Sequence, residues 1–349
     1  MNYPAYVPGR HDSDWDGVRL HVVTGKGGTG KTTIAAALAV ALATGGHRVL
    51  LAEVEGRAGI APLFGVPLAP HAEGHVAVAP GGGEVLALSV EPEAALLEYL
   101  ELFYRLGRAG RALERLGAID FVTTVAPGLR DVLLIGKVYE AVRRRVDGRR
   151  VYDAVVLDAP PTGRITRFLN VNREVAGLAR VGPIHHHASS IMQLLRSPET
   201  AVHLVTVLEE MPVQETVDGV GELRAAGLPV GGVVVNLVRD PVLAAAELDA
   251  AADGLLDREA VAAGLETAGL GGRRVEDAGL PARVRVQTLA DGLLVEAAEH
   301  GVRLRLGDRQ FRRVEELGRP TYQVPALPCG IDLGALYELA ERLRDQGLA

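Results

Sequence analysis

Short runs of β-branched and aliphatic residues recur along the chain, and the stretches between them mostly show apolar residues at helical spacing. Several of these runs are unbroken rather than alternating, which is typical of strands buried on both faces of a parallel sheet. The intervening helical patterns predict an α/β fold with a doubly wound, mostly parallel sheet. The predicted strands are 18–24, 49–53, 85–90, 152–158, 202–208, 230–238 and 321–324.

Two stretches depart from this alternation. Residues 91–150 carry no strand pattern, and their leucines recur at helical spacing, which predicts a helical subdomain inserted into the sheet domain. Residues 240–308 are rich in Ala, Leu, Glu, Asp and Arg and predict a second helical insertion. We expect residues 1–17 to form a flexible tail that precedes a single domain over 18–349.

Composition and charge argue against several classes of protein, among them nucleic-acid-binding, membrane-spanning and secreted proteins. The net charge of −7 provides no general basic face, so we expect no nucleic acid partner. The longest apolar run, Ile34 to Ala43, is half of the roughly 20 residues that a membrane-spanning helix needs. No secretory signal is apparent, and the single cysteine, Cys329, excludes an internal disulfide or a cysteine zinc cage. These features predict a cytoplasmic protein that does not itself span a membrane.

A glycine-rich loop follows the first predicted strand and opens a helix that includes Thr33. Its spacing fits G-x-x-x-x-G-K-[ST], in which backbone N–H groups and a lysine bind phosphates and a hydroxyl binds Mg²⁺. Only three lysines occur among 37 basic residues, and two of them fall in this loop. The compact ammonium suits a phosphate cradle better than a planar guanidinium. The loop reads Gly25, Lys26, Gly27, Gly28, Thr29, Gly30, Lys31 and Thr32.

Lys26 is an addition to the ordinary motif. The run K-G-G-T-G-K-T over 26–32 resembles the deviant Walker A loop of a group that includes ArsA arsenite-pump ATPases, tail-anchored-protein targeting ATPases, MinD, ParA and the nitrogenase iron protein. The resemblance implies a P-loop ATPase domain over 18–349 that binds Mg-ATP. It also implies a dimer in which Lys26 reaches the phosphates bound by the partner subunit, while Lys31 contacts those of its own chain.

An acidic residue, Asp158, ends the predicted strand 152–158 and precedes Ala-Pro-Pro-Thr-Gly. A carboxylate beside the phosphate loop can hold the water shell of Mg²⁺ together with Thr32, and Gly163 can present its N–H to the γ-phosphate. The run D-A-P-P-T-G resembles the D-T-A-P-T-G of the ArsA and tail-anchored-protein branch. A buried strand that ends in a proline turn is the simpler alternative.

Three further positions are matched through this resemblance. Glu55 occupies the place of the family aspartate that orients the attacking water, although Gly56 replaces the usual proline; Glu53, or a solvated acidic turn, is the alternative. Asn236 lies near the end of strand 230–238 and resembles the asparagine that contacts adenine, but it can also be a turn residue. Pro325 lies in a late loop that resembles the one packed on the adenine face.

The resemblance is closest to actinobacterial ArsA-like proteins. One cysteine cannot form the metalloid site of the arsenite pumps, so arsenite or antimonite is not expected as a ligand. We therefore expect a dimeric ATPase, homodimeric or paired with a paralogue, that couples nucleotide state to an unknown client or membrane protein. The alternatives are a low-turnover chaperone or regulatory subunit within a heterodimer and, less favoured, a partitioning ATPase of the ParA or MinD type.

Other residues have simpler interpretations. His185, His186 and His187 are expected to lie in a loop or at a helix start, since adjacent imidazoles point in different directions. Leu333, Leu336, Leu339 and Leu343 predict a docked terminal helix. Lys137 is interpreted as a surface lysine, with a functional role as the alternative.

Overall fold

The computed structural model describes residues 15–54, 59–69, 72–90, 95, 127–170, 183–270, 282–328 and 330–349. The chain divides into two compact units. One, here called the helical unit, holds Arg239–Arg313. The other, the sheet unit, holds Tyr6–Val238 and Val314–Ala349.

The sheet unit is built on an eight-stranded sheet in the order β10-β9-β8-β1-β7-β2-β4-β3. Neighbouring strands are parallel except for β3, which pairs antiparallel to β4 at one edge. The α/β fold with a mostly parallel sheet is therefore confirmed. The strands of this sheet are β1 (Leu20–Gly25), β2 (Arg48–Glu53), β3 (Gly74–Ala79), β4 (Gly83–Ser89), β7 (Ala154–Asp158), β8 (Thr200–Thr206), β9 (Val230–Val238) and β10 (Thr321–Pro325).

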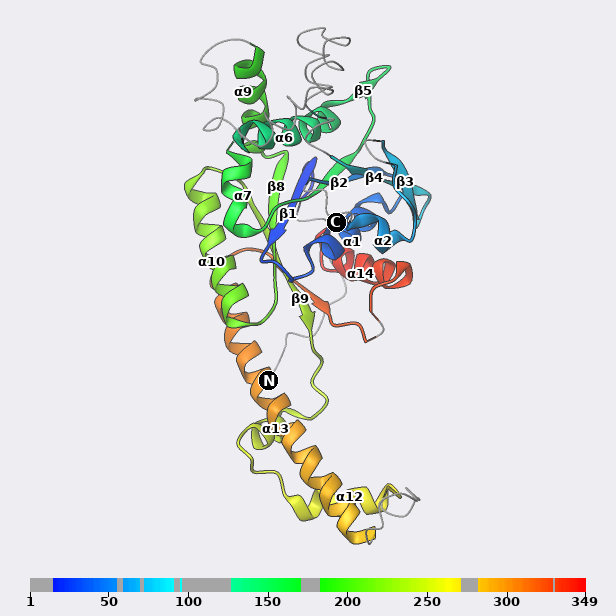
Figure 1. The fold of residues 1–349 in the computed structure, drawn as a ribbon, viewed down its shortest axis with the longest axis vertical. Coiled ribbons are helices and arrows are strands. Elements are labelled where there is room, and N and C mark those ends of the chain that lie inside the picture. Colours follow the sequence, from blue (N-terminus) through cyan, green and yellow to red (C-terminus); the bar gives the residue numbers. More distant parts are fainter. Residues whose placement is uncertain are drawn as a thin grey trace, which may run out of the picture. The chain divides into compact units, whose positions relative to one another are not determined.

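Helices cover both faces of this sheet (Figure 1). Successive strand residues alternate between two core clusters, as the pleat requires. In β1, for example, Val22 packs in the cluster that includes residues of α6, α7, α9 and α10, while Val23 packs in the cluster that includes α1, α2 and α14. The helices of this unit are α1 (Lys31–Ala43), α2 (Ile60–Phe64), α6 (Pro127–Arg143), α7 (Thr162–Leu169), α9 (Pro183–Leu195), α10 (Glu210–Ala225) and α14 (Leu333–Asp345).

Helix α1 carries the phosphate loop on the sheet. It is rich in alanine, and Ile34, Leu38 and Val40 are fully buried among those small side chains. Small residues allow the helix to pack closely against the strands on one side and α14 on the other. The predicted docking of α14 is confirmed for Leu336, Leu339 and Leu343, which are buried, whereas Leu333 in its first turn is 40% exposed.

The helical unit contains α11 (Ala245–Ala252), α12 (Arg258–Thr267) and most of α13 (Ala282–Glu315). Bidentate ion pairs hold its helices together: Arg305 contacts Asp253 at 2.6 Å, and Arg258 contacts Asp291 at 2.5 Å. Asp257 caps α12 by accepting a hydrogen bond from the N–H of Glu259. Among the described residues of both units, no helix combines the length and apolar character needed to cross a membrane.

Two strand features were not predicted from the sequence. The edge strand β3 is antiparallel and half exposed, so it lacks the unbroken apolar run by which the other strands were found. A two-stranded hairpin, β5 (Arg145–Val146) and β6 (Arg149–Arg150), also lies inside the stretch predicted to be helical. Its strands are two residues long and largely polar, so neither hydrophobic period could reveal them.

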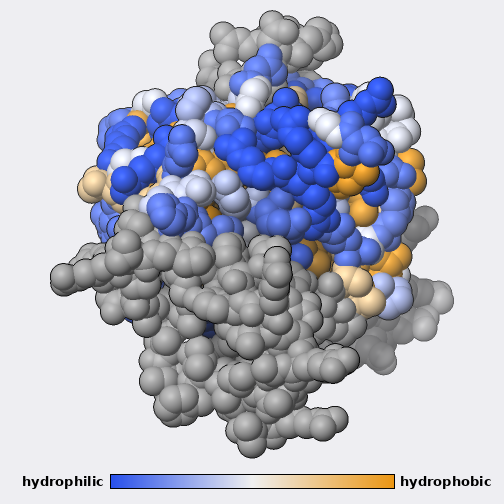
Figure 2. All heavy atoms as spheres, turned by 90° about the horizontal axis from the view of Figure 1, so that it is seen from above, coloured by the Kyte–Doolittle hydropathy of each residue, from blue (hydrophilic) through white to orange (hydrophobic). Residues whose placement is uncertain are grey.

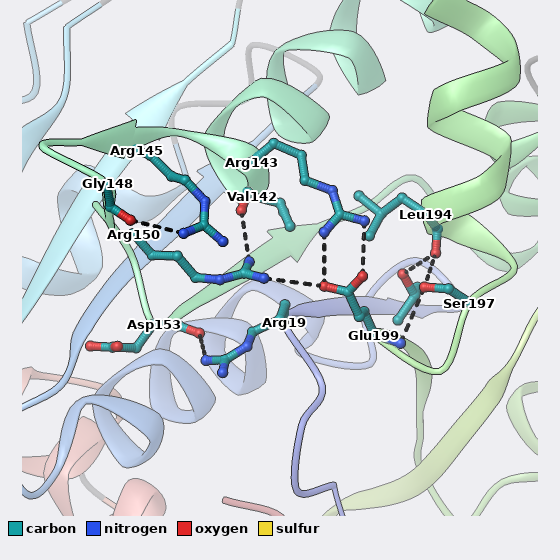
Figure 3. A network of polar contacts seen from close by, with 11 residues as sticks. Arg19, Val142, Arg143, Arg145, Gly148, Arg150, Asp153, Leu194, Ser197 and Glu199 are labelled. Carbon is teal, nitrogen blue, oxygen red and sulfur yellow. Dashed lines mark hydrogen bonds and ion pairs between the residues drawn. The ribbon is translucent and has the colours of Figure 1, made fainter.

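The hairpin lies near Arg19, Asp153 and Glu199, which directly precede β1, β7 and β8 (Figure 3). It is therefore at the amino ends of these strands, whereas the phosphate loop follows the carboxyl end of β1. Glu199, directly before β8, accepts two 2.9 Å hydrogen bonds from Arg143 and lies 3.7 Å from Arg150. The hydrogen bonds from Arg143 hold the pKa of Glu199 below its usual range. Seen from this end, the described surface is largely hydrophilic (Figure 2). The net charge of the whole chain is negative and therefore gave no indication of this local cluster of arginines.

Candidate nucleotide site

The loop between β1 and α1 depends on glycine at both of its ends. A Cβ on Gly25 would lie 2.1 Å from the carbonyl oxygen of Val205, so β8 passes too close for any side chain. Gly30 has φ +84°, and a Cβ there would lie 2.3 Å from the amide nitrogen of Asn236. The loop is therefore fixed by its neighbours in the sheet as well as by its own sequence.

Hydrogen bonds within the loop converge on the carbonyl oxygen of Lys26. The buried ammonium of Lys31 donates to this oxygen at 3.1 Å, and the hydroxyl of Thr29 donates to it at 2.9 Å. The side-chain amide of Asn236 donates to the carbonyl oxygen of Thr29 at 2.9 Å. The loop is thus tied to β9, and Lys31 lies along its inner side.

Thr32 and Asp158 meet at the carboxyl edge of the sheet. The Thr32 hydroxyl donates to the Asp158 carboxylate at 2.6 Å. Near the end of β1, the buried Thr24 hydroxyl donates to the carbonyl oxygen of Pro160 at 2.7 Å and fixes the segment after Asp158. That segment leads to Gly163 in the first turn of α7, where backbone N–H groups have no partner within the helix.

The chemistry of these donors fits Mg²⁺. A hydroxyl and a carboxylate are hard oxygen ligands, and Mg²⁺ commonly takes one or two protein oxygens while substrate phosphates and waters complete its octahedron. Within the described part of the chain, no group of three or more His, Cys, Asp or Glu could hold a metal ion without such help. The site is therefore suited to a metal that arrives with a phosphate ligand rather than to a preformed protein cage.

The side chain of Lys26 is 31% exposed, and its ammonium pairs with Glu215 of α10 at 2.9 Å. The second oxygen of that carboxylate accepts a 3.3 Å hydrogen bond from Thr162, the first residue of α7. Glu215 therefore connects the phosphate loop to the segment that follows Asp158. The sequence did not indicate this ion pair, because Glu215 lies 189 positions from Lys26 in the numbering and no local pattern connects the two residues.

Asn236 and Pro325 lie near the carboxyl ends of two neighbouring strands, since Gln323 pairs with Val235 and Pro325 with Val238. Both are thus at the same edge of the sheet as the phosphate loop. Asn236 is buried, and its side-chain amide donates to the loop. Contact between this amide and an adenine base stays a prediction. Glu55 and Gly56, like Cys329, lie outside the described residues.

The remaining candidates lie elsewhere in the sheet unit. The three histidines fall in α9, where His187 packs edge-on against Tyr139 and burial lowers its pKa. Lys137 on α6 forms a 3.5 Å ion pair with Glu140. Neither observation places these residues with the phosphate loop.

Known proteins resemble the chain over most of its length. Residues 18–197 match the family model described as Anion-transporting ATPase. The chain is 50% identical over 333 residues to ATPase BagA of Mycobacterium tuberculosis. This alignment covers 95% of the present chain and 94% of BagA. It is 28% identical over 222 residues to the arsenical pump-driving ATPase of Escherichia coli (62% of this chain, 34% of that protein). ATPase GET3B of Arabidopsis thaliana is 24% identical over 272 residues (64% of this chain, 65% of that protein). The chain therefore belongs to the ArsA-type, anion-transporting ATPase family, a family of nucleotide-binding proteins.

Proposed function

We propose that the chain binds and hydrolyses Mg-ATP as a cytoplasmic dimer and couples its nucleotide state to a client or membrane protein. The observation that carries the proposal is the meeting of Thr32 and Asp158, 2.6 Å apart, beside the glycine loop that contains Lys31. A phosphate cradle, a cation and two oxygen ligands for a metal are thereby collected at the carboxyl edge of a parallel sheet, where α/β proteins bind their ligands.

Each residue of the loop has a separate role in this proposal. The N–H groups of residues 25–33 and the dipole of α1 bind the phosphates, and Lys31 exchanges the Lys26 carbonyl for phosphate oxygens. Thr32 and Asp158 hold Mg²⁺, which supplies neutralisation of phosphate charge when bound. Gly163 contributes an N–H to the γ-phosphate, and Glu55 orients the attacking water. Asn236 and Pro325 contact the adenine once ATP is bound.

Lys26 is the residue that requires a second subunit. Its ammonium is partly exposed and is held by Glu215, with side-chain exposures of 31% and 35%. Ion pairs this accessible contribute about 1 kcal/mol or less, so a phosphate of the partner can displace Glu215 at little cost. When Lys26 moves to the partner's nucleotide, Glu215 loses this ion pair but can keep the hydrogen bond that it accepts from Thr162 at the start of α7.

A low-turnover regulatory or chaperone subunit paired with a paralogue is the second candidate. It is favoured by Glu55 and Gly56, which replace the family aspartate and proline. The added methylene changes the reach of the carboxylate, and glycine loosens the backbone that carries it. Such a subunit would bind ATP and dimerise while turning over slowly.

Calorimetric titration with Mg-ATP tests the site itself. Lys31→Ala should abolish measurable binding because it removes the phosphate counter-charge, whereas Lys137→Ala, which removes the only lysine outside the loop, should bind as wild type does. Equal binding by wild type and Lys31→Ala would refute the assignment.

Subunit mixing tests the dimer. Lys26→Ala and Lys31→Ala should each be inactive alone, and a mixed dimer should regain one complete site. Recovery of ATPase activity supports a homodimer in which Lys26 acts across the interface. Absence of recovery, with subunit exchange verified by mass spectrometry, would contradict that arrangement.

A further inference from the structure

Glu53 is a buried carboxylate at the carboxyl end of β2, and it is 5% exposed. One of its oxygens accepts hydrogen bonds from the N–H of Gly59 at 3.0 Å and from that of Ile60 at 3.3 Å. Ile60 is the first residue of α2. Glu53 thus binds the residues that directly follow segment 55–58, which contains the proposed water-orienting Glu55, and it stands two residues before that segment begins.

The same carboxylate lies next to the proposed metal site. Glu53 pairs in register with Asp158 across β2 and β7. A Cβ built on Gly59 would lie 3.7 Å from the hydroxyl of Thr32 and 3.8 Å from the bonded oxygen of Glu53. The Thr32 hydroxyl and the bonded oxygen of Glu53 therefore both lie within 4 Å of one point beside Gly59. Glu53 is thus close enough to the proposed metal site to act on the water shell of a metal ion.

A helix cap alone does not account for a glutamate at this position. A neutral Gln, which has the same length, could accept from the same N–H groups without burying a charge. Burial of a carboxylate beside a second carboxylate, Asp158, is unfavourable because like charges on neighbouring strands repel. A divalent cation next to Thr32 and Asp158 reverses the sign of that interaction.

We propose that Glu53 is a positioning residue that links the Mg-ATP site at Thr32 and Asp158 to the start of α2, because its carboxylate binds the N–H groups of Gly59 and Ile60 beside that site. The inference rests on the proposed function, because it requires Mg-ATP at Thr32 and Asp158. Metal binding then strengthens the hold of Glu53 on Gly59 and Ile60, so that the start of α2 responds to the bound substrate.

The sign of the effect distinguishes this role from a structural one. Glu53→Gln keeps an oxygen for the two N–H groups but loses the charge. In EDTA it should bind ATP at least as tightly as wild type, since one negative charge near the triphosphate is gone. With Mg²⁺ the gain in ATP affinity that the metal confers should fall about 10-fold, as is usual when a partner outside the ligand shell is removed. Glu53→Ala should have the same effects on ATP binding and should also speed hydrogen exchange at the amides of Gly59 and Ile60, because it removes the oxygen to which they donate.

Calorimetric titration of each variant with ATP, in EDTA and in excess Mg²⁺, measures this gain directly. Glu84→Gln is the matched control, because Glu84 lies near the start of β4, at the opposite edge of the sheet, and pairs with Arg48. Its Mg²⁺ effect should equal that of wild type. An unchanged Mg²⁺ effect in Glu53→Gln, or weaker ATP binding in EDTA, would overturn the inference. Failure of wild type to bind ATP at all would instead refute the proposed function.

Discussion

Two histidines in the middle of the sheet make its stability depend on pH. His21 of β1 and His203 of β8 are both buried, with Nδ1 of His21 3.1 Å from Nε2 of His203. The N–H of Gly232 donates to Nδ1 of His203 at 3.1 Å, which leaves the proton of a neutral His203 on Nε2 and directs it to His21. Trp15 packs edge-on against His203, with ring centroids 5.1 Å apart. Both imidazoles are therefore held in the neutral form.

Burial lowers the pKa of His21 to about 4 from 6.5. Burial, and then the charges of His21 and Arg319, hold the pKa of His203 well below its usual value. Between pH 6.5 and 4 the unfolded chain takes up protons that the folded chain does not, so the free energy of unfolding falls as pH falls. The His21 shift corresponds to about 3 kcal/mol once pH has fallen below 4, and about 2 kcal/mol of it is already lost at pH 5.

The double variant His21→Asn, His203→Asn removes both titrating groups while keeping acceptors and donors in place. The quantity to compare is the change in free energy of unfolding between pH 7.5 and 5, because any constant destabilisation cancels from that difference. This change in the free energy of unfolding between pH 7.5 and 5 should be at least about 2 kcal/mol smaller in the double variant than in wild type. Urea unfolding followed by fluorescence of Trp15, the only tryptophan, reports on the sheet unit.

His75→Asn, at an exposed position of β3, serves as the control and should leave the pH dependence of wild type unchanged. Equal pH dependence of wild type and the double variant would refute the reasoning, because it would mean that the paired imidazoles accept protons in the folded state.

Four further predictions concern other parts of the molecule. Asp158→Asn should retain ATP binding but lower Mg²⁺-dependent turnover in a steady-state assay, and an unchanged rate would contradict its role at the metal. Glu215→Gln should lower the ATP concentration for half-maximal dimerisation by up to about 5-fold, measured by light scattering, because Lys26 is released from a partly exposed ion pair. Leu339→Ala, at a 2% exposed position of α14, should lower the free energy of unfolding by about 2–5 kcal/mol in denaturant titrations. Arsenite should not stimulate the ATPase, since Cys329 offers one thiolate; a stimulation lost in Cys329→Ser would overturn this.

The candidate phosphate loop could be predicted from the sequence because the residues that would bind phosphate are contiguous. Residues 25–32 follow one another, so the motif can be recognised without knowledge of the neighbouring strands. The central strands were found for a similar reason, since burial on both faces leaves an unbroken apolar run. Asp158 ends such a run, so the sequence alone assigns it to the carboxyl edge of the sheet, and the alanines of α1 by themselves indicate a closely packed helix.

The contacts that surround the phosphate loop depend on the order of the strands in the sheet. The chain order of the parallel strands differs from their order in the sheet, so hydrophobic periodicity does not reveal which strand ends are neighbours. Only the fold places Glu53 beside Asp158, Asn236 against Thr29 and Lys26 on Glu215. The sequence determined which groups could bind phosphate, because those groups share one loop; the tertiary structure decided which carboxylates and amides hold that loop, because they come from strands and helices far away in the chain.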